Sequence, residues 1–523
     1  MYPTVSENQT VAMTETFFTM RDGVKLYTRI VSPRNAEKTP IVFIRTPYEA
    51  SHNGEKHDIN AYTDNLFIKN GYSIILQHCR GRGDSEGICI PYINEKNDGL
   101  DTLEQIRELS IYNGEIYLFG ESYLVSVHLC YISEKPRDIK GAVFNIQTDR
   151  MYFRNYRNGC NYDLCNLNWW ISMIKRQYPN QNTENAIKRP YIDVMKRIIG
   201  EDFPYYNSHL LNDKYNDFWQ SDPRTYATEN IEFPVLFLEG WYDFYNDCMF
   251  SMWERLPEET RKKSVFFAGP WGHSTRVTPL SEYPIKNGNL PSDYAVKWFD
   301  SIRKNTKYEY SEAGKLNYYS LVGATWKSAD YPFEYSKTKR LYFNKNNALT
   351  DLPCTEDHKI SYVYDPDKKV DCFKYQSIYK AHEIDSIDGI VSFVSEPAKE
   401  ESSFRGKVRW RINVSTDCED TAFYMRVYFV ENGTAYNLTE TITSLSHISS
   451  SYRSGNIIEI DIVTPPIAWT MKEGMQIRVD ISSNGGIYLP HANVKGHWAE
   501  VTECKIANNT LHIKDSFIEL LCE

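Results

Sequence analysis

The sequence predicts a doubly wound, mostly parallel α/β sheet that is interrupted by a helical cap and followed by an all-β jelly-roll domain. Three observations predict this architecture. Short apolar runs alternate with amphipathic helical patterns in the first half, the alternation stops in the middle, and strictly alternating strands fill the last third. We therefore expect residues 1–146 and 226–304 to form the sheet domain, 147–225 the cap, and 305–523 the β domain.

Six short, unbroken apolar runs are expected to form the central strands of the sheet. They lie at residues 40–47, 72–78, 116–119, 141–145, 234–240 and 264–270. Runs of this kind are typical of strands that are buried on both faces of a parallel sheet. Between them, residues 62–71 and 98–110 have the spacing of amphipathic helices, which completes the alternation of a doubly wound fold.

The segment from 147 to 225 breaks this alternation. It contains NWWISMIKRQYP (168–179), further aromatic residues and a proline-rich stretch, but no convincing strand. We interpret it as a mostly helical insertion. Because it lies between two strands of the sheet domain, we expect it to cap the edge of the sheet.

The last third of the chain has the period-two pattern of half-buried antiparallel strands. In KVRWRINVS (407–415), the apolar residues Trp410 and Ile412 alternate with arginines. Asn432 and Gly433 separate two strand-like runs, which is a strong hairpin signal. The region is therefore predicted to be all-β, either a sandwich or a jelly roll.

Composition and charge exclude several classes of function. With a net charge of −10, the chain lacks the basic surface that a nucleic-acid partner requires. It has no apolar run of about 18 residues, so we expect no membrane-spanning helix and no membrane partner. The N-terminal MYPTVSENQTVAMTE has neither the basic nor the apolar region of a secretion signal. The 11 cysteines form no C-x-x-C pair, which favours a cytoplasmic location and predicts neither a metal site nor a cofactor.

A serine, an aspartate and a histidine each follow one of the predicted strands, in the chain order Ser122, Asp243, His273. A serine hydroxyl is a weak nucleophile at neutral pH. It needs an imidazole to accept its proton and a carboxylate to orient that imidazole. In one class of doubly wound sheet, the three groups follow strands in this same order. We therefore predict that these three residues form a catalytic triad.

The turn around Ser122 reads GESYL, so it keeps Gly120 but has Leu124 in place of the second glycine of a G-x-S-x-G elbow. Leucine at that position is a steric cost in the first turn of the following helix, and it removes no reacting group. Taken alone, Ser122 also fits a turn serine that caps this helix. Asp243 and His273 taken alone fit a loop aspartate and a structural histidine, and only the joint order of the three favours the triad.

Eight segments spread over nearly the whole chain match the motifs of one known family. They are MRDGVKLYTRIVSP (20–33), IRTPYEA (44–50), QHCRGRGDSEG (77–87), NEKNDGLDTLEQI (94–106), FGESYL (119–124), GWYDFY (240–245), AGPWGHS (268–274) and VSFVSEP (391–397). The chain resembles the cocaine esterase/X-Pro dipeptidyl-peptidase family of serine hydrolases. The resemblance implies an α/β-hydrolase fold and cleavage of an ester or amide through an acyl-enzyme on Ser122. It also implies that His273 is the general base and acid and that Asp243 orients it.

The resemblance implies an oxyanion hole made by the hydroxyl of Tyr48 and the backbone N–H of Tyr123. A phenol and an amide aimed at the developing alkoxide would stabilise it in a low-dielectric site. His78 stands where the family commonly has an aspartate, so we expect Arg80 to have a different partner. The alternative that His78 joins the active site stays open.

Specificity is expected to come from the cap. The aromatic candidates for an apolar pocket are Tyr152, Phe153, Trp169, Trp170, Trp241 and Phe244, and each one singly also fits a core position. The expected substrate is a small ester, an amide or a short peptide. The sequence leaves open the natural substrate and whether the chain forms a homo-oligomer.

Two alternatives remain for the function. The first is an X-Pro dipeptidyl-peptidase or α-amino acid ester hydrolase that needs a free amino group, which a carboxylate such as Asp149, Asp163 or Glu49 would bind. The second is a hydrolase-fold protein whose catalysis is impaired by Leu124 and which acts as a binding protein.

Overall fold

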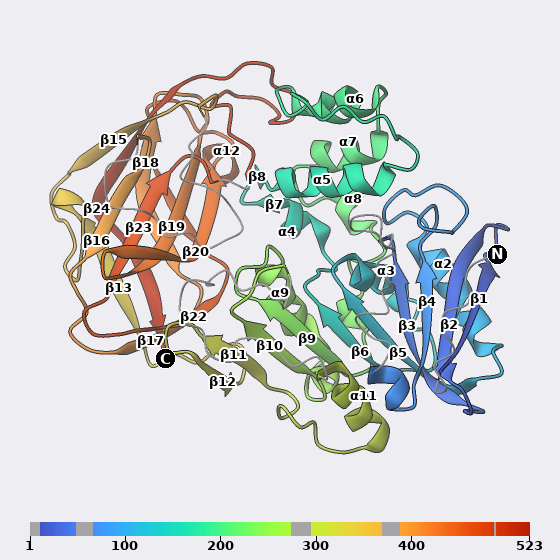
Figure 1. The fold of residues 1–523 in the computed structure, drawn as a ribbon. Helices are drawn as coiled ribbons and strands as arrows, with labels where there is room; N and C mark the ends of the chain where they lie inside the picture. The colour runs from blue at the N-terminus through green and yellow to red at the C-terminus, as the bar shows by residue number, and fades with distance from the viewer. Residues whose placement is uncertain (1–10, 49–65, 274–293, 369–387, 486–487) are drawn as a thin grey trace.

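The computed structural model describes residues 11–48, 66–273, 294–368, 388–485 and 488–523, except the side chains of 163–166. The chain forms a large, mostly parallel sheet, a helical cap and a second sheet that makes up the C-terminal domain (Figure 1). This is the α/β-hydrolase architecture with a C-terminal β domain that the sequence predicts.

The main sheet has ten strands in the order β1-β2-β4-β3-β5-β6-β9-β10-β11-β12. Their bounds are β1 (Val11–Thr19), β2 (Lys25–Pro33), β3 (Thr39–Thr46), β4 (Ser73–His78), β5 (Tyr112–Glu121), β6 (Ile139–Asn145), β9 (Val235–Gly240), β10 (Val265–Gly269), β11 (Leu316–Ser320) and β12 (Thr325–Ala329). The strands from β4 to β11 are parallel, whereas β1, β2 and β12 pair antiparallel at the two edges. Each of the six predicted apolar runs therefore becomes a parallel strand.

Both faces of this sheet are covered, which explains why its central strands are unbroken apolar runs. All eight residues of β3 and all six of β9 are buried. Helices α2 (Glu95–Arg107), α3 (Tyr123–Ile132) and α9 (Asn246–Arg255) pack on one face, and α11 (Tyr294–Lys304) packs on the other. Trp298 of α11 donates its indole N–H to the carbonyl of Ala142 in β6 at 3.0 Å, which ties that helix to the sheet.

The cap segment is mostly helical. Its helices are α4 (Met151–Asn155), α5 (Asp163–Ile174), η1 (Tyr191–Asp193), α6 (Val194–Ile199), α7 (Pro204–Leu211) and α8 (Asp217–Gln220). Two strands of two residues each, β7 (Tyr156–Arg157) and β8 (Cys160–Asn161), pair with each other and have no counterpart in the sequence pattern. Figure 1 shows the cap helices above the main sheet and beside the β domain. A loop of that domain holds the cap, because the N–H of Ile192 donates to the carbonyl of Ala499 at 2.8 Å.

The C-terminal domain is built on one twelve-stranded sheet. Its strands are β13 (Lys337–Asn344), β14 (Ala348–Thr350), β15 (Lys359–Tyr364), β16 (Val391–Ser395), β17 (Ser402–Gly406), β18 (Arg409–Thr416), β19 (Ala422–Glu431), β20 (Thr434–Ser444), β21 (Ile458–Val463), β22 (Ile467–Met471), β23 (Gln476–Ser482) and β24 (Ala507–Cys522). The long strand β24 pairs with β13, β15, β17 and β18, so it connects the parts of the domain. The short helices η2 (Thr228–Asn230), α10 (Glu258–Arg261), η3 (Lys345–Asn347) and α12 (Leu445–Ile448) complete the fold.

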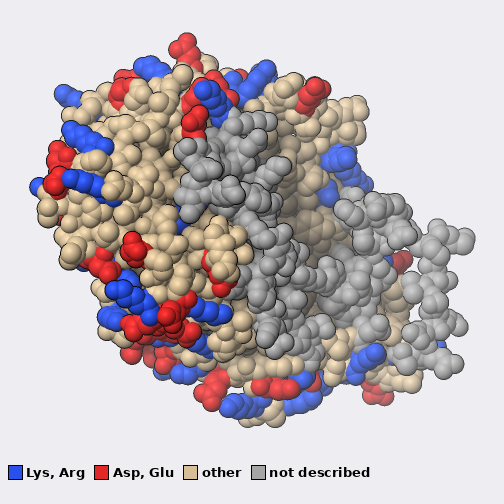
Figure 2. All heavy atoms as spheres, turned by 60° about the vertical axis from the view of Figure 1, so that its left-hand side comes forward, with Lys and Arg blue, Asp and Glu red and all other residues tan. Residues whose placement is uncertain are grey.

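The β-domain patterns seen in the sequence appear as expected. Buried and half-buried residues alternate along the whole of β18, with Trp410 and Ile412 inside. Asn432 and Gly433 connect β19 to β20 with φ values of 50° and 74°, the left-handed pair that a tight hairpin turn requires. On the face drawn in Figure 2, acidic and basic side chains are intermixed rather than separated into fields of one sign.

Strands β11 and β12 fall within 305–523, the range that the sequence assigns to the β domain, yet they extend the main sheet. β11 pairs parallel to β10, and β12 pairs antiparallel to β11. The second sheet meets them directly, because the N–H of Leu321 donates to the carbonyl of Ala468 at 2.9 Å. Apolar alternation identifies a strand but does not say which sheet it joins.

Within the described residues, no helix combines the length and the apolar character that crossing a membrane requires.

Candidate active site

Ser122 occupies the turn between β5 and α3. Its backbone has φ 55° and ψ −125°, an unusual conformation for a residue other than glycine. Two hydrogen bonds hold the turn: the N–H of Ser122 donates to the carbonyl of Asn145 at 2.9 Å, and the N–H of Val125 donates to the carbonyl of Ser122 at 2.9 Å. A strained turn of this kind at a strand end is typical of a nucleophile elbow.

The structure explains why this elbow keeps one glycine and tolerates the loss of the other. A Cβ atom on Gly120 would come within 2.6 Å of the backbone carbonyl of Leu124 and 2.7 Å of the backbone nitrogen of Val125. No side chain fits there, because the helix passes too close. The side chain of Leu124 is half-buried and packs against the apolar cluster on the α11 face, so it fills space without entering the turn.

Asp243 and His273 lie in the loops that follow the neighbouring strands β9 and β10. Two backbone bonds join these loops, from the N–H of Trp241 to the carbonyl of Gly269 at 2.8 Å and from the N–H of Tyr242 to the carbonyl of Trp271 at 3.1 Å. A Cβ on Gly269 would lie 1.8 Å from the Trp271 ring, so glycine at this position leaves room for the tryptophan.

The three predicted triad residues form one hydrogen-bonded chain. The Nδ1 atom of His273 lies 2.7 Å from Oδ2 of Asp243, and its Nε2 atom lies 3.0 Å from Oγ of Ser122. The side chain of Asp243 is fully buried, and its Oδ1 accepts the N–H of Tyr245 at 2.7 Å. The Phe244 ring stacks on the imidazole with centroids 4.4 Å apart and planes 21° apart, which holds the ring of His273 in orientation.

A second buried carboxyl, which the sequence reading missed, lies on β9 just before the loop that carries the aspartate. Glu239 is completely buried, and its Oε1 accepts the N–H of Gly240 at 2.6 Å. Burial, together with the charge on Asp243, raises the pKa of Glu239 well above its usual range. Burial therefore favours the protonated form of Glu239. The apolar residues around Glu239 gave no signal of chemistry in the sequence.

Tyr48 approaches Ser122 from the loop that follows β3, and Tyr123 from the start of α3. The hydroxyl of Tyr48 interacts with the side chain of Ser122 and accepts the indole N–H of Trp169 at 3.3 Å. Burial raises the pKa of Tyr48 to about 12, so the phenol keeps its proton. Tyr123 is the first residue of α3, where backbone N–H groups have no intrahelical acceptor.

A chain of contacts behind Tyr123 fixes its position. Its hydroxyl donates to Oε1 of Glu95 at 3.0 Å and accepts the N–H of Tyr92 at 2.9 Å. The other oxygen of Glu95 forms an ion pair with the buried Arg45 at 2.8 Å. The backbone N–H of Tyr123, next to Ser122, is therefore held in place because the side chain of Tyr123 is anchored to Glu95 and, through it, to Arg45 in the core.

The triad opens into a cavity of about 270 Å³. Its lining residues are Tyr48, Tyr92, Ser122, Tyr123, Gln147, Arg154, Trp169, Phe244, Tyr245 and His273. Two of the six predicted pocket aromatics, Trp169 and Phe244, belong to this lining. The sequence reading missed the side chains of Tyr92, Gln147, Arg154 and Tyr245. Only Tyr245 had a signal, since it follows Asp243 by two residues.

The other four pocket candidates lie elsewhere, which corrects that prediction. Trp170 packs against Phe203 and Tyr206 in the core of the cap. The indole of Trp241 donates to the carbonyl of Tyr319 within the main core. The two remaining candidates pack away from Ser122: Tyr152 stacks on Tyr156, and Phe153, 46% exposed, lines a separate surface groove. The buried rings of Tyr152, Trp170 and Trp241 therefore contribute to packing.

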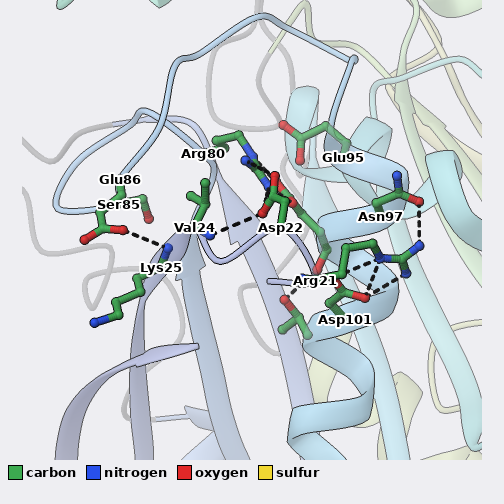
Figure 3. A network of polar contacts seen from close by, with 12 residues as sticks. Arg21, Asp22, Val24, Lys25, Arg80, Ser85, Glu86, Glu95, Asn97 and Asp101 are labelled. Carbon is green, nitrogen blue, oxygen red and sulfur yellow. Dashed lines mark hydrogen bonds and ion pairs between the residues drawn. The ribbon is translucent and has the colours of Figure 1, made fainter. Parts of the chain in front are cut away.

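Arg80 has partners other than His78 (Figure 3). It binds Asp98 of α2 at 2.7 and 3.1 Å, and Asp22 at 2.6 and 3.2 Å. The Nδ1 atom of His78 accepts the N–H of Asp84 at 3.3 Å, and its ring lies 5.0 Å from that of Tyr27. His78 is absent from the cavity lining, so in this structure it serves the glycine-rich loop rather than the site.

Of the three carboxylates considered for binding a substrate amine, Asp149 is the one whose side chain the structure describes, and it does not line the cavity. Asp149 is buried and bonds to Arg255 at 2.6 and 2.9 Å and to Thr228 at 2.5 Å. Glu49 and the side chain of Asp163 lie outside the described residues. Among the described residues, no group of three or more potential metal ligands is clustered.

Comparisons with known proteins cover almost the entire chain. The family model of the X-Pro dipeptidyl-peptidase (S15 family) matches residues 22–275, and that of the X-Pro dipeptidyl-peptidase C-terminal non-catalytic domain matches residues 310–513. A cocaine esterase of Rhodococcus sp. (strain MB1 Bresler) is 21% identical over 555 residues, covering 94% of this chain and 95% of the esterase.

Two solved structures have the same fold over their whole length. An aminopeptidase from a marine sediment archaeon, Thaumarchaeota archaeon, superposes with a TM-score of 0.83 at 18% identity, covering 100% of this chain and 98% of the other. An α-amino acid ester hydrolase superposes with a TM-score of 0.82 at 18% identity and the same coverage. At this identity the superpositions establish the fold.

Proposed function

The chain belongs to the cocaine esterase/X-Pro dipeptidyl-peptidase family of serine hydrolases, and from this premise we propose that it cleaves an ester or amide through an acyl-enzyme on Ser122. The observation that carries the proposal is the chain of contacts from Asp243 through His273 to Ser122, at 2.7 and 3.0 Å. Both distances are those of hydrogen bonds that a general base needs.

In the proposed reaction, Oγ of Ser122 attacks the carbonyl carbon while Nε2 of His273 accepts the hydroxyl proton. The carboxylate of Asp243 stabilises the imidazolium that forms. The tetrahedral intermediate then collapses, the bond to the leaving group breaks, and His273 gives the proton to that group. A water molecule deprotonated by His273 attacks the acyl-enzyme, which releases the acid and restores Ser122.

We assign the oxyanion hole to the Tyr48 hydroxyl and the Tyr123 N–H. Because Trp169 donates to the oxygen of Tyr48, the phenol proton remains available for a substrate oxygen. The raised pKa of Tyr48 keeps that proton in place over the neutral pH range. A preorganised donor of this kind typically lowers the barrier by about 2.7–4 kcal/mol.

The geometry argues against a protein whose catalysis is impaired by Leu124. This side chain packs on the far face of the sheet, and the triad contacts form in its presence. Gly120, which the close approach of the helix requires, is retained. We therefore propose an active enzyme rather than a binding protein.

The size of the cavity supports a small substrate. A volume of about 270 Å³ lies near the lower limit of small-molecule sites. The matching proteins include one named for an ester and one named as an aminopeptidase, so both ester and amide cleavage are within the proposal. Ester cleavage requires less catalysis of leaving-group expulsion than amide cleavage, because an alcohol departs more readily than an amine.

We also propose that the protein works in the cytoplasm. Nine cysteines in the described part of the chain are free thiols, and eight of these are buried. Buried thiols without disulfides suit a reducing compartment. Unchanged activity and melting temperature in excess dithiothreitol would support this proposal, and a loss of either would contradict it.

A fluorophosphonate probe tests the proposed function. The folded wild-type protein should be labelled once, on the peptide that contains Ser122. The variants Ser122→Ala and His273→Ala should remain unlabelled while keeping the wild-type circular dichroism spectrum. Failure of the folded wild-type protein to react, or a label on another residue, would reject the proposal.

A further inference from the structure

We propose that the buried ion pair between Arg45 and Glu95 positions both donors of the oxyanion hole, so that losing the pair lowers kcat and leaves KM almost unchanged. The inference rests on the proposed function, because it concerns the donors assigned to Tyr48 and Tyr123. It goes beyond that function by giving a role in the reaction to two charged residues that are not among the lining residues of the cavity.

Arg45 and Glu95 connect the main sheet to helix α2. Arg45 is on β3 and is fully buried, and Glu95 is the first residue of α2 and is 6% exposed. Nη1 of Arg45 lies 2.8 Å from Oε2 of Glu95 and donates to the backbone carbonyl of Glu95 at 3.1 Å. Nε of Arg45 donates to Oε1 of Gln77, on the neighbouring strand β4, at 2.9 Å. The guanidinium is therefore fixed by the sheet on one side and by the start of α2 on the other.

Glu95 links this pair to the oxyanion donor of Tyr123. Its other oxygen, Oε1, accepts the hydroxyl of Tyr123 at 3.0 Å, and that hydroxyl accepts the N–H of Tyr92 at 2.9 Å. Burial, and after it the charge of Glu95, raises the pKa of Tyr123 well above its usual range, so the phenol keeps the proton that it donates. Because Tyr123 is the first residue of α3, a shift of its side chain is transmitted to the backbone N–H next to Ser122.

Arg45 links the same pair to the other donor. It lies near the end of β3, three residues before Tyr48, which is in the loop that follows this strand. The N–H of Tyr48 donates to Oγ1 of Thr46 at 3.1 Å. Nε of Arg82 donates to the carbonyl of Pro47 at 2.6 Å, so the loop is held close to the end of the strand. The ion pair therefore joins the segment that carries one donor to the carboxylate that holds the other.

The position of these donors matters because they act on a charge that exists only in the transition state. Such a donor is effective when it already points at the place where the oxyanion forms. A displacement of about 1 Å can cost on the order of a hundredfold in rate, even when the altered side chain lies away from the reacting atoms. An interaction made in the transition state alone changes kcat and leaves KM nearly constant. This split distinguishes a positioning role from a role in substrate binding.

Stability alone does not explain a charged pair in this core. Buried ion pairs are often no more stabilising than well-packed apolar residues of similar volume. Removing one partner is nevertheless strongly destabilising, because the other charge is left buried without compensation. An informative variant therefore either removes both charges together or leaves the pair intact.

Two variants weaken the hold on Tyr123 in this way. Tyr123→Phe deletes the hydroxyl and keeps the ring, the backbone N–H and the ion pair. The charge-free variant, Arg45→Met with Glu95→Gln, removes both charges and keeps similar side-chain volumes. The matched control is Tyr131→Phe. Tyr131 is also on α3, is fully buried and has its hydroxyl 2.5 Å from Nδ1 of His128, but it lies eight residues further along the helix.

We expect Tyr123→Phe to lower kcat for p-nitrophenyl hexanoate by roughly five- to fiftyfold, with KM within about twofold of the wild-type value. The charge-free variant should lose at least as much in kcat, and adding Tyr123→Phe to it should change little, because both break the same chain of contacts. Tyr131→Phe should keep the wild-type kcat. A wild-type kcat for Tyr123→Phe, a change in KM alone, or an equal loss of kcat in the control would overturn the proposal.

A double-mutant cycle tests the link to the other donor. If the pair positions Tyr48, the charge-free variant should cost less in the background of Tyr48→Phe than in the wild type, because one of the donors it aligns is already gone. Fully multiplicative losses would remove Tyr48 from the proposal. Arg45→Lys keeps the positive charge and should give a smaller loss of kcat than the charge-free variant, and it serves for the same cycle if that variant does not fold.

The rate of fluorophosphonate labelling separates this inference from the proposed function, because the phosphonyl oxygen occupies the oxyanion hole as the adduct on Ser122 forms. The second-order rate constant should fall in Tyr123→Phe by a factor close to the loss in kcat, and it should stay at the wild-type value in Tyr131→Phe. If the wild type is labelled on Ser122 and Tyr123→Phe reacts equally fast, the function stands and this inference fails. If the folded wild type does not react at all, the proposed function itself fails.

Discussion

The edge of the sheet and the cap above it contribute to one cavity, but the fold constrains them differently. At the edge, Ser122, Asp243 and His273 each follow a strand, and backbone bonds join the loops to one another. In the cap, Arg154 lies on α4, whose Met151 and Tyr152 pack into the main core, and Trp169 lies on α5, whose apolar residues form the core of the cap. From this contrast we expect the reaction to depend on the sheet and the choice of substrate to depend on the cap. The experiments below either sharpen this contrast or break it.

Removing the nucleophile or the base should have the largest effect. We expect Ser122→Ala and His273→Ala each to lower kcat by roughly 10⁴- to 10⁶-fold, because the groups act as a unit. For the same reason, the double variant should be no slower than either single variant. Steady-state kinetics with p-nitrophenyl hexanoate measures this. Multiplicative losses in the double variant would show that the two side chains act independently.

Removing the phenol of the oxyanion hole should have the next largest effect. Tyr48→Phe deletes one donor and keeps the ring, so kcat should fall by about 10²- to 10³-fold while KM changes little. Tyr152→Phe is the control, since its hydroxyl donates to the carbonyl of Asp213 away from Ser122, and it should keep the wild-type kcat. A kcat for Tyr48→Phe that matches the wild type would remove Tyr48 from the site.

In the cap, two adjacent tryptophans offer a matched pair. Trp169→Phe loses the indole N–H that donates to Tyr48, so kcat/KM should fall by roughly tenfold at most, as for one neutral hydrogen bond. Trp170→Phe changes a side chain buried in the cap core, so it should lower the melting temperature and leave the kinetics unchanged. If the two variants had the same kinetics, the cap would not contribute through Trp169.

Restoring the second glycine of the elbow tests whether Leu124 limits the activity of the wild-type enzyme. Leu124→Gly removes a half-buried apolar side chain and places glycine in the first turn of α3. The free energy of unfolding should fall by about 1–3 kcal/mol, while kcat stays near the wild-type value. A large rise in kcat would mean that Leu124 impairs the wild-type enzyme.

The smallest effect concerns Glu239, the buried carboxyl group beneath the site. Glu239 has a raised pKa in the folded protein and one of about 4.3 when unfolded, so the unfolded state releases the proton first as pH rises. Its contribution to stability is therefore complete below about pH 4 and is lost as the pH rises toward the folded pKa. Glu239→Gln does not titrate, so its melting temperature relative to the wild type should rise by on the order of 2 °C between pH 5 and 7. A difference that does not vary with pH would contradict the raised pKa.

The sequence predicted the strands of the sheet and the three residues that meet at its edge, because both depend on short-range patterns. Buried runs mark the strands, and each reacting residue comes directly after a run. The contacts of Arg154 and Tyr92 could not be predicted, because they form only when the cap docks on the sheet. Adjacent residues show the same limit: Trp169 faces the cavity while Trp170 packs in the cap core, and one step along a helix turns a side chain by about 100°.

The acyl-enzyme is tested most directly by running the reaction in water with added methanol and measuring how the acyl group partitions between the two. Hexanoate esters with several leaving groups should give the same ratio of methyl hexanoate to hexanoic acid, because all would pass through one intermediate on Ser122. This holds whichever step limits the rate, and both products should be absent above background with Ser122→Ala. A ratio that changes with the leaving group, or turnover that persists in Ser122→Ala, would contradict the account.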